Sequence, residues 1–185
     1  MGAIANIKET IANLYLRYKL MRVIKNKTPN KFSFDNAKTI AILFDSTDKS
    51  DYELMKKYVS YLREYHKKVK VIGFYNVKEV PDFAYSKLEY DFFSIKSLNL
   101  IGKPKPLFVE QFIEEEFDLL IDLNLNNRFP LKYISSLSKA QFKVGNYSKK
   151  NTSMYDLMID ISKTPNLKYF MQQVDVYLAM INKSK

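Results

Sequence analysis

The sequence predicts an α/β protein: one three-layer sandwich with a mostly parallel, Rossmann-like sheet, preceded by an amphipathic N-terminal helix. From residue 38 onward, continuous apolar runs alternate with segments of helical periodicity, a pattern typical of buried strands joined by helices. A chain of 185 residues with 46% apolar and 27% charged residues fits one globular domain. We therefore expect a basic amphipathic helix over residues 1–30 and an α/β domain over residues 31–185.

The N-terminal helix is predicted by apolar residues at alternating spacings of three and four, which align one seam along a helix of about 20 residues. The seam consists of Ile4, Ile7, Ile11, Leu14, Tyr18 and Met21. Arg17, Lys19 and Arg22 fall largely outside it, and Pro29 ends the helix. Three roles remain open: packing on its own domain, docking on a partner protein, and lying on an anionic membrane or an RNA backbone.

The remaining elements follow in alternation. Apolar runs predict strands at residues 39–44, 69–75, 90–93, 98–101, 117–123, 140–145 and 155–161. Helical periodicity predicts helices at residues 51–65, 107–115, 130–138 and 166–182. Because residues 39–75 have the order strand, helix, strand, this crossover should be right-handed and its two strands parallel.

Several kinds of chemistry are excluded by composition. Without Cys and with one His, the chain has no thiol nucleophile, disulfide, thiolate zinc site or multi-His metal site. His66 precedes a strand beside two lysines and is interpreted as a solvated loop residue. The four glycines form neither of the Gly-rich motifs that cradle phosphates. We therefore expect no cofactor and no metal site.

Three carboxylates lie at or near the ends of predicted strands: Asp45, Asp122 and Asp160. Ligands of open α/β sheets bind beyond the carboxyl ends of the strands, so these acids are candidate catalytic residues that could gather around a hard cation. Asp and Ser also commonly cap the helix that follows a strand, and Asp48 or Ser50 fits that role before the helix at residue 51. Both interpretations remain open.

The formal charge of +10 is concentrated at the two ends of the chain. Residues 1–33 contain seven bases and one acid, residues 34–122 contain 13 bases and 16 acids, and residues 123–185 contain ten bases and three acids. Basic chain ends attract polyanions. In residues 128–150, aromatic residues lie between the basic ones and could stack on the bases of a single-stranded nucleic acid. The candidate polyanion-binding residues are Arg17, Lys19, Arg22, Lys25, Lys27, Arg128, Lys132, Lys143, Lys149 and Lys150.

Two resemblances emerge from these segments. Residues 117–145, with the runs FDLLIDL and SKAQFKVG, resemble part of the acceptor-side domain of heptosyltransferase-type glycosyltransferases. The ordered set AILFD, FDLLID, SKAQFKVG and YDLMID resembles, over most of the chain, an uncharacterised bacterial domain-of-unknown-function family of similar length. The second resemblance implies a single α/β domain and no particular activity.

The resulting functional hypothesis is a non-enzymatic adaptor that binds a polyanionic partner through its basic ends. RNA or a ribosome is the first candidate, and an anionic membrane face or a membrane-protein complex is the second. The alternative is a small phosphotransfer or glycosyltransferase-like enzyme that uses the strand-end carboxylates. The N-terminal residues contain no targeting or membrane-spanning segment, so we expect a cytoplasmic protein, with the inner membrane face as a peripheral location.

Overall fold

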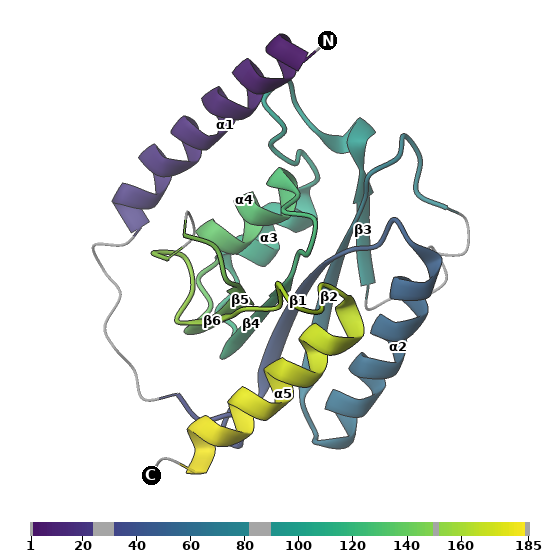
Figure 1. The fold of residues 1–185 in the computed structure, drawn as a ribbon, viewed down its shortest axis with the longest axis vertical. Coiled ribbons are helices and arrows are strands. Elements are labelled where there is room, and N and C mark those ends of the chain that lie inside the picture. The colour runs from purple at the N-terminus through teal and green to yellow at the C-terminus, as the bar shows by residue number, and fades with distance from the viewer. Residues whose placement is uncertain (1, 24–31, 82–89, 150–151, 184–185) are drawn as a thin grey trace.

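The computed structural model describes residues 2–23, 32–81, 90–149 and 152–183, which form a six-stranded parallel sheet with helices on both faces (Figure 1). The strands are β1 (Thr39–Asp45), β2 (Lys68–Tyr75), β3 (Tyr90–Ser94), β4 (Leu119–Leu123), β5 (Phe142–Asn146) and β6 (Leu157–Ile159). The helices are α1 (Gly2–Val23), α2 (Lys49–Glu64), the short 3-10 helix η3 (Ile95–Ser97), α3 (Leu107–Glu114), α4 (Phe129–Leu137) and α5 (Leu167–Lys183). This is the predicted α/β architecture.

The strands are arranged in the order β3-β2-β1-β4-β5-β6, and every neighbouring pair is parallel. The chain therefore builds the sheet outward from β1 in one direction and then, from β4, in the other. Strand order of this kind is the Rossmann arrangement, and its topological switch point lies between β1 and β4. A ligand site of this fold class is expected beyond the carboxyl ends of those two strands.

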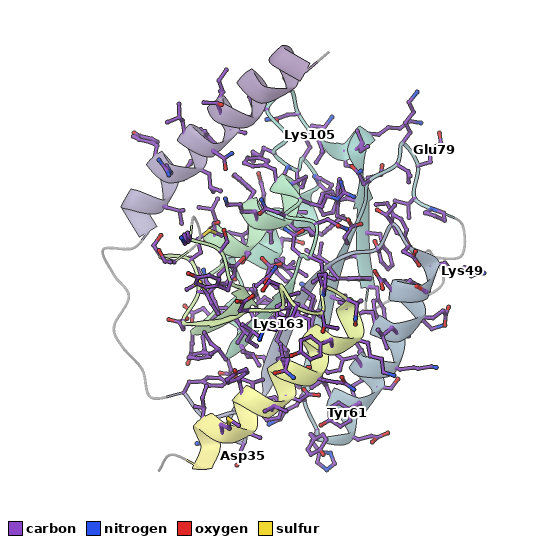
Figure 2. The ribbon with its side chains drawn as sticks, viewed as in Figure 1. Asp35, Lys49, Tyr61, Glu79, Lys105 and Lys163 are labelled. Atoms are coloured by element: carbon purple, nitrogen blue, oxygen red, sulfur yellow. The ribbon has the colours of Figure 1, made fainter. Side chains whose placement is uncertain are left out.

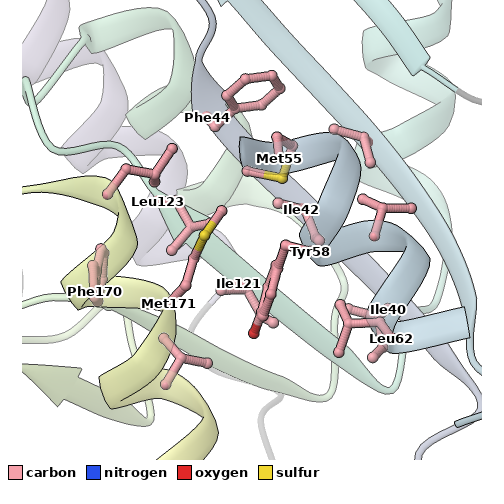
Figure 3. Close-up of a cluster of buried hydrophobic side chains, with 14 of the residues drawn as sticks. Ile40, Ile42, Phe44, Met55, Tyr58, Leu62, Ile121, Leu123, Phe170 and Met171 are labelled. Atoms are coloured by element: carbon pink, nitrogen blue, oxygen red, sulfur yellow. The ribbon is translucent and has the colours of Figure 1, made fainter. Parts of the chain in front are cut away.

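One face of the sheet is covered by α2 and α5 and is called the α2/α5 face here. Alternate residues of the central strands, such as Ile42 and Ile121, pack against Met55 of α2 and Phe170 of α5 (Figure 3). Asp48 caps the start of α2 by accepting a hydrogen bond from the Ser50 backbone N–H at 2.6 Å. The capping interpretation of Asp48 is thus confirmed.

The opposite face is covered by α3 and α4 and is called the α3/α4 face. Here the intervening strand residues, such as Leu43 and Leu120, pack against Phe112 of α3 and Ile134 of α4. Helix α1 lies outside this layer along α4 (Figure 1) and contributes Leu16 to the same core. The three predicted layers are present, with α1 added on one side.

Within the residues that the structure describes, one predicted strand is absent. Residues 98–101 were expected to form a strand, but they belong to a turn in which the Asn99 carboxamide oxygen accepts the backbone N–H groups of Ile101 and Lys103. Gly102 follows with a φ of +83°, a conformation that glycine adopts without strain. The side-chain bonds of an Asn compete with strand pairing, which apolar spacing alone does not reveal.

The N-terminal helix forms over Gly2–Val23 and packs on α4, while its predicted end at Pro29 lies outside the described residues. The three seam residues whose side chains the structure describes do not face the domain. Ala12 and Leu16, each 2% exposed, make the contact, whereas Ile11, Leu14 and Tyr18 are 49%, 60% and 49% exposed. The small side chain of Ala12 allows α1 to approach α4 closely. The buried face of α1 is therefore the face whose shape fits the domain, which differs from the predicted apolar seam. The interpretation of the seam as the packing face is therefore wrong for these three residues.

Candidate functional site

The switch point between β1 and β4 is closed by an ion pair. Asp45 ends β1, and its Oδ2 accepts hydrogen bonds from Arg128 Nε at 2.7 Å and from Asn126 Nδ2 at 3.0 Å. Burial raises the pKa of Asp45, but hydrogen bonds from Thr47, Arg128 and Asn126 outweigh it and hold the pKa below its usual value. Asp45 is therefore an ionised anchor for the β4–α4 loop.

The β4–α4 loop is held in place by its own asparagines. Asn124 accepts the backbone N–H of Arg128 through Oδ1 at 2.7 Å and donates through Nδ2 to the Arg128 carbonyl oxygen at 2.9 Å. Asn127, between them, has a φ of +49°, which Asn tolerates better than most residues. The loop therefore presents Asn126, Asn127 and Arg128 at the carboxyl edge of the sheet in one defined geometry.

A buried carboxyl lies next to this loop on the α3/α4 face. Asp122 of β4 accepts a hydrogen bond from the Tyr155 hydroxyl at 2.6 Å and one from the Asn124 backbone N–H at 3.1 Å. Burial raises the pKa of Asp122 to about 6, against the opposing effect of these hydrogen bonds. Burial thus favours the protonated form of Asp122 more than water does.

Tyr155 reaches Asp122 because the neighbouring strand position has no side chain. Gly145 of β5 is the register partner of Asp122, and a Cβ at Gly145 would lie 2.5 Å from the Tyr155 ring. The ring therefore packs on the glycine backbone. Beyond it lies a polar hollow of about 140 Å³, lined by Asp122, Asn124, Asn127, Lys132, Asn146, Ser148 and Tyr155.

Lys143, predicted to bind polyanions, is buried instead. Its side chain is 6% exposed, and Nζ donates to the carbonyl oxygens of Ser135 at 3.0 Å and Ser136 at 3.4 Å. These carbonyls belong to α4, so the ammonium ties β5 to the helix above it. The prediction failed because a strand residue that faces a helix layer is withdrawn from solvent whatever its charge.

The three candidate catalytic acids do not come together. Asp45 is held by Arg128, Asp122 by Tyr155, and exposed Asp160 accepts the backbone N–H of Ser162 in a local turn at 2.9 Å. Among residues 2–23, 32–81, 90–149 and 152–183, no group of three His, Cys, Asp or Glu residues is placed to hold a metal ion. The arrangement provides separate carboxylates, each with a structural partner.

Basic side chains from the two ends of the chain instead line one groove. The groove lies between α1 and the start of α4, has a volume of about 390 Å³ and is lined by both Arg17 and Lys132. Its other walls include Asn13, Asn127 and the Phe129 ring. Asn127 and Lys132 also line the hollow beside Asp122, so the two depressions adjoin.

The other predicted basic residues are distributed differently. Lys19 Nζ lies 5.9 Å from the centre of the Tyr15 ring on α1, Lys149 is exposed after β5, and Arg22 belongs to α1. Lys25, Lys27 and Lys150 fall outside the described residues. Other charged residues, such as Lys49 and Glu79, lie at the periphery of the body (Figure 2).

Several residues of this region were not identified from the sequence. Asn126, Asn127 and Tyr155 belong to no motif. Asn126 and Tyr155 contact Asp45 and Asp122, which lie 81 and 33 residues away in the chain. One signal was present: the sequence NLNNR follows a predicted strand, and polar residues after a buried parallel strand are placed at the binding edge.

The fold and this edge define a Rossmann-like three-layer α/β protein whose switch point is occupied by its own Asp45–Arg128 ion pair. The chain belongs to a family described as "Family of unknown function (DUF6913)", whose model matches residues 8–181. This confirms the resemblance to an uncharacterised family and adds nothing to the glycosyltransferase resemblance of residues 117–145. Neither a curated protein nor a solved structure matches the chain.

Proposed function

We propose that the protein is a non-enzymatic adaptor that binds the backbone of RNA, free or in a ribonucleoprotein, in the groove between α1 and α4. The observation that carries this proposal is the meeting of Arg17 and Lys132 in one groove. They come from the two basic ends of the chain, which are separated in sequence by a mildly acidic segment. Two bases on opposite walls suit successive phosphates of a strand.

Two further groove residues fit the same ligand. Phe129 offers a ring on which an unpaired base can stack, and Asn127 offers an amide for sugar or phosphate oxygens. The first turn of α4 begins at Phe129, so the positive end of that helix dipole lies at the groove. Each feature favours an extended, anionic, single-stranded ligand.

Features of the Rossmann-like edge argue against a bound nucleotide cofactor as the main ligand. The turn from β1 to α2 contains Ser46, Thr47 and Asp48 in place of glycines, and the Asp45–Arg128 pair fills the switch point. The enzymatic alternative needs converging carboxylates, and each of the three acids has its own partner. The groove beside the edge is the better candidate.

The proposal is tested by the salt dependence of RNA binding. Fluorescence anisotropy with a labelled single-stranded RNA should give an affinity that falls steeply with salt, at about 0.7 log unit per log unit for each phosphate contacted. The double variant Arg17→Glu with Lys132→Glu should bind at least about tenfold more weakly and with a shallower slope.

A matched control separates the groove from net charge. Lys57→Glu with Lys168→Glu makes the same change of charge on exposed positions of α2 and α5, on the other face of the sheet. This control should keep most of the affinity. Equal losses in both double variants, or binding that ignores salt, would contradict the proposal.

A further inference from the structure

A second, larger cavity lies beside the groove at the carboxyl edge of the sheet and is called the switch-point cavity here. Its volume is about 740 Å³, within the range of roughly 300–1,000 Å³ that is typical of small-molecule sites. One wall contains Phe74, the register partner of Asp45 at the end of β1, and another contains residues 126–130, before and within α4. The cavity therefore lies where a Rossmann-like fold places its ligands.

Most of the residues that line the switch-point cavity are apolar. They extend from Phe74, which is 1% exposed, to Leu100, which is 88% exposed, so the cavity reaches from the core to the surface. The turn that carries Leu100 is held by the Asn99 carboxamide and by a bridge between Leu98 and Pro104. The apolar lining includes Phe74, Ile95, Leu98, Leu100, Ile101 and Phe129. These walls suit the apolar body of a ligand.

Arg128 supplies the charge of the switch-point cavity. Among the described residues that line the cavity, it is the one charged residue, and none is acidic. Its Nε donates to Asp45, and within the part of the chain that the structure describes, its two terminal Nη groups have no hydrogen-bond partner. The Arg128 side chain is 31% exposed. The planar fork of such a guanidinium binds a carboxylate or a phosphate through two parallel hydrogen bonds.

The position of Arg128 is fixed through both its side chain and its backbone. Asp45 holds the side chain, and Asn124 bonds to the backbone N–H and to the carbonyl oxygen. A residue held in this way loses little conformational entropy when a ligand binds. Asn126, whose Nδ2 donates to the same Asp45 oxygen, and Asn76 add amide groups to the lining. The cavity therefore combines an oriented cation, neutral amides and apolar walls.

We propose that the switch-point cavity binds a small organic acid, a molecule with one carboxylate or phosphate head and an apolar body. The head pairs with the Nη groups of Arg128 and accepts hydrogen bonds from asparagine amides. The body packs against Phe74 and Leu98, which removes its apolar surface from water. One such molecule satisfies both the cation and the apolar walls.

Two other occupants satisfy less of the cavity. A nucleotide cofactor needs a glycine-rich turn after β1 for its diphosphate, and Ser46, Thr47 and Asp48 stand there. An RNA backbone needs bases at successive phosphates, and it offers nothing apolar to the walls. The cavity and the RNA groove share Asn127 and Phe129, but Leu100 and Arg128 line only the cavity. Failure of either proposal therefore leaves the other standing.

The experiment uses anilinonaphthalene sulfonate, a dye whose sulfonate stands in for the anionic head and whose fluorescence rises when its rings leave water. We expect saturable binding to the full-length protein, and weaker binding of uncharged phenylnaphthylamine, which has the same rings. Naphthyl phosphate and naphthylacetate should displace the dye, and the better competitor identifies the head group. Naphthol, which is uncharged at neutral pH, should require at least about a tenfold higher concentration because it forgoes the pair with Arg128.

Two matched substitutions test the location of the site. Leu100→Glu places an acid at the mouth of the cavity and should weaken dye binding at least about fivefold by charge repulsion. Leu107→Glu makes the same change at a leucine that is 68% exposed at the start of α3 and does not line the cavity, so it should bind the dye as the unmodified protein does. Arg128→Gln removes the guanidinium and should weaken dye binding at least about tenfold.

Three outcomes would overturn the proposal. One is the absence of saturable dye binding, or displacement by naphthol as effective as that by the two acids. Another is equal dye affinity in the Leu100→Glu and Leu107→Glu variants. The third is a loss of single-stranded RNA affinity in Leu100→Glu but not in Leu107→Glu, which would assign the cavity to the RNA strand. Circular dichroism checks folding, and the two leucine variants decide the result if Arg128→Gln unfolds.

Discussion

The two faces of the sheet are built from the same strands but differ in what they bury. The α2/α5 face encloses an almost wholly apolar cluster, from Phe44 to Phe170. The α3/α4 face also has an apolar core, but it encloses the carboxyl of Asp122 and the ammonium of Lys143 and borders both the groove and the polar hollow. Apolar packing stabilises the fold but does not recognise a particular ligand. The buried polar groups and the two depressions therefore make the α3/α4 face the candidate binding face.

Each face also contains one Tyr–Asp pair, and the two pairs sharpen the contrast. On the α2/α5 face, the Tyr58 hydroxyl of α2 donates to Asp175 Oδ1 of α5 at 2.8 Å, linking two helices. On the α3/α4 face, Tyr155 donates to Asp122 at the end of a central strand. Burial raises the pKa of each carboxyl to about 6. Only the second pair faces a hollow at the ligand-binding edge.

The largest expected effect tests the apolar face. Phe170→Ala removes a fully buried ring from the α2/α5 face and should lower the free energy of unfolding by about 3–5 kcal/mol, because it leaves a cavity among packed side chains. Urea unfolding followed by circular dichroism measures this. RNA affinity, measured where the variant is still folded, should not change; a large loss there would mean that the faces are not separable.

Two glycines give a matched comparison of the faces. A Cβ at Gly73 would lie 2.5 Å from the Phe92 ring on the α2/α5 face, and a Cβ at Gly145 the same distance from the Tyr155 ring on the α3/α4 face. Gly73→Ala and Gly145→Ala should each cost about 1–3 kcal/mol of stability through overpacking, measured by chemical unfolding.

The two glycine variants should differ in their dependence on pH. Gly145→Ala pushes Tyr155 away from Asp122 and so alters the titration of that carboxyl, whereas Gly73→Ala has no such partner. NMR titration of the Asp122 side chain measures the shift. An identical pKa of Asp122 in both variants would contradict the placement of Tyr155 on Gly145.

The raised pKa values predict how stability depends on pH. With a pKa of about 6 in the native state and about 3.9 when unfolded, Asp122 binds more protons in the native state between those values. Its contribution to the free energy of unfolding therefore falls as pH rises from about 4 to 6 and is constant above that window. Asp122→Asn should remove up to about 3 kcal/mol of this change.

Asp175 supplies the comparison for that prediction. Its pKa is also raised by burial, against a hydrogen bond from Tyr58, but it lies half-buried on a helix, so Asp175→Asn should remove a smaller part of the same change. Thermal unfolding at pH 4.5, 6 and 8 measures both variants. If Asp175→Asn reduced the pH dependence of stability more than Asp122→Asn does, the expected difference between the two faces would be contradicted.

The smallest effect is expected at the switch point. Asp45→Asn weakens the pair with Arg128, whose side chain is partly exposed, so we expect a loss of about 1 kcal/mol above pH 5. The pKa of Asp45 is lowered, so its contribution is present above the unfolded pKa and is lost as pH falls through the folded value. The difference between the two proteins should therefore shrink below pH 4, as chemical unfolding over that range can show.

Much of the fold was predictable from local pattern. Runs such as residues 39–44 and 69–75 are apolar without interruption, which is what a strand buried on both faces requires, and the structure places β1 and β2 there. The parallel pairing of β1 with β2 was predictable because the helix predicted between them leaves enough chain for a crossover. The exception, residues 98–101, depended on Asn99 side-chain bonds that the apolar spacing does not encode.

The candidate site was predictable only in part. Charge counting identified Arg17 and Lys132 but also included Lys143, which is buried beneath α4. Strand-end position identified Asp45, Asp122 and Asp160 but not their partners. Asp45 and Asp122 pair with the distant residues Arg128 and Tyr155, whereas Asp160 is held in a local turn by Ser162. Whether a charged side chain is exposed, and which residue it pairs with, depends mainly on segments that are distant in the chain. The neighbouring residues in the sequence do not reveal either property.

The sequence by itself determined the elements, their alternation and the concentration of basic residues at the two ends, because these depend on short-range spacing and on composition. Tertiary structure alone decided which face of α1 is buried, that Arg17 and Lys132 line the same groove, and that Asp45 pairs with Arg128 across the switch point. The physical reason is close packing: helices pack where surfaces fit, so Ala12 and Leu16 face the domain, while Ile11, Leu14 and Tyr18 remain half exposed or more.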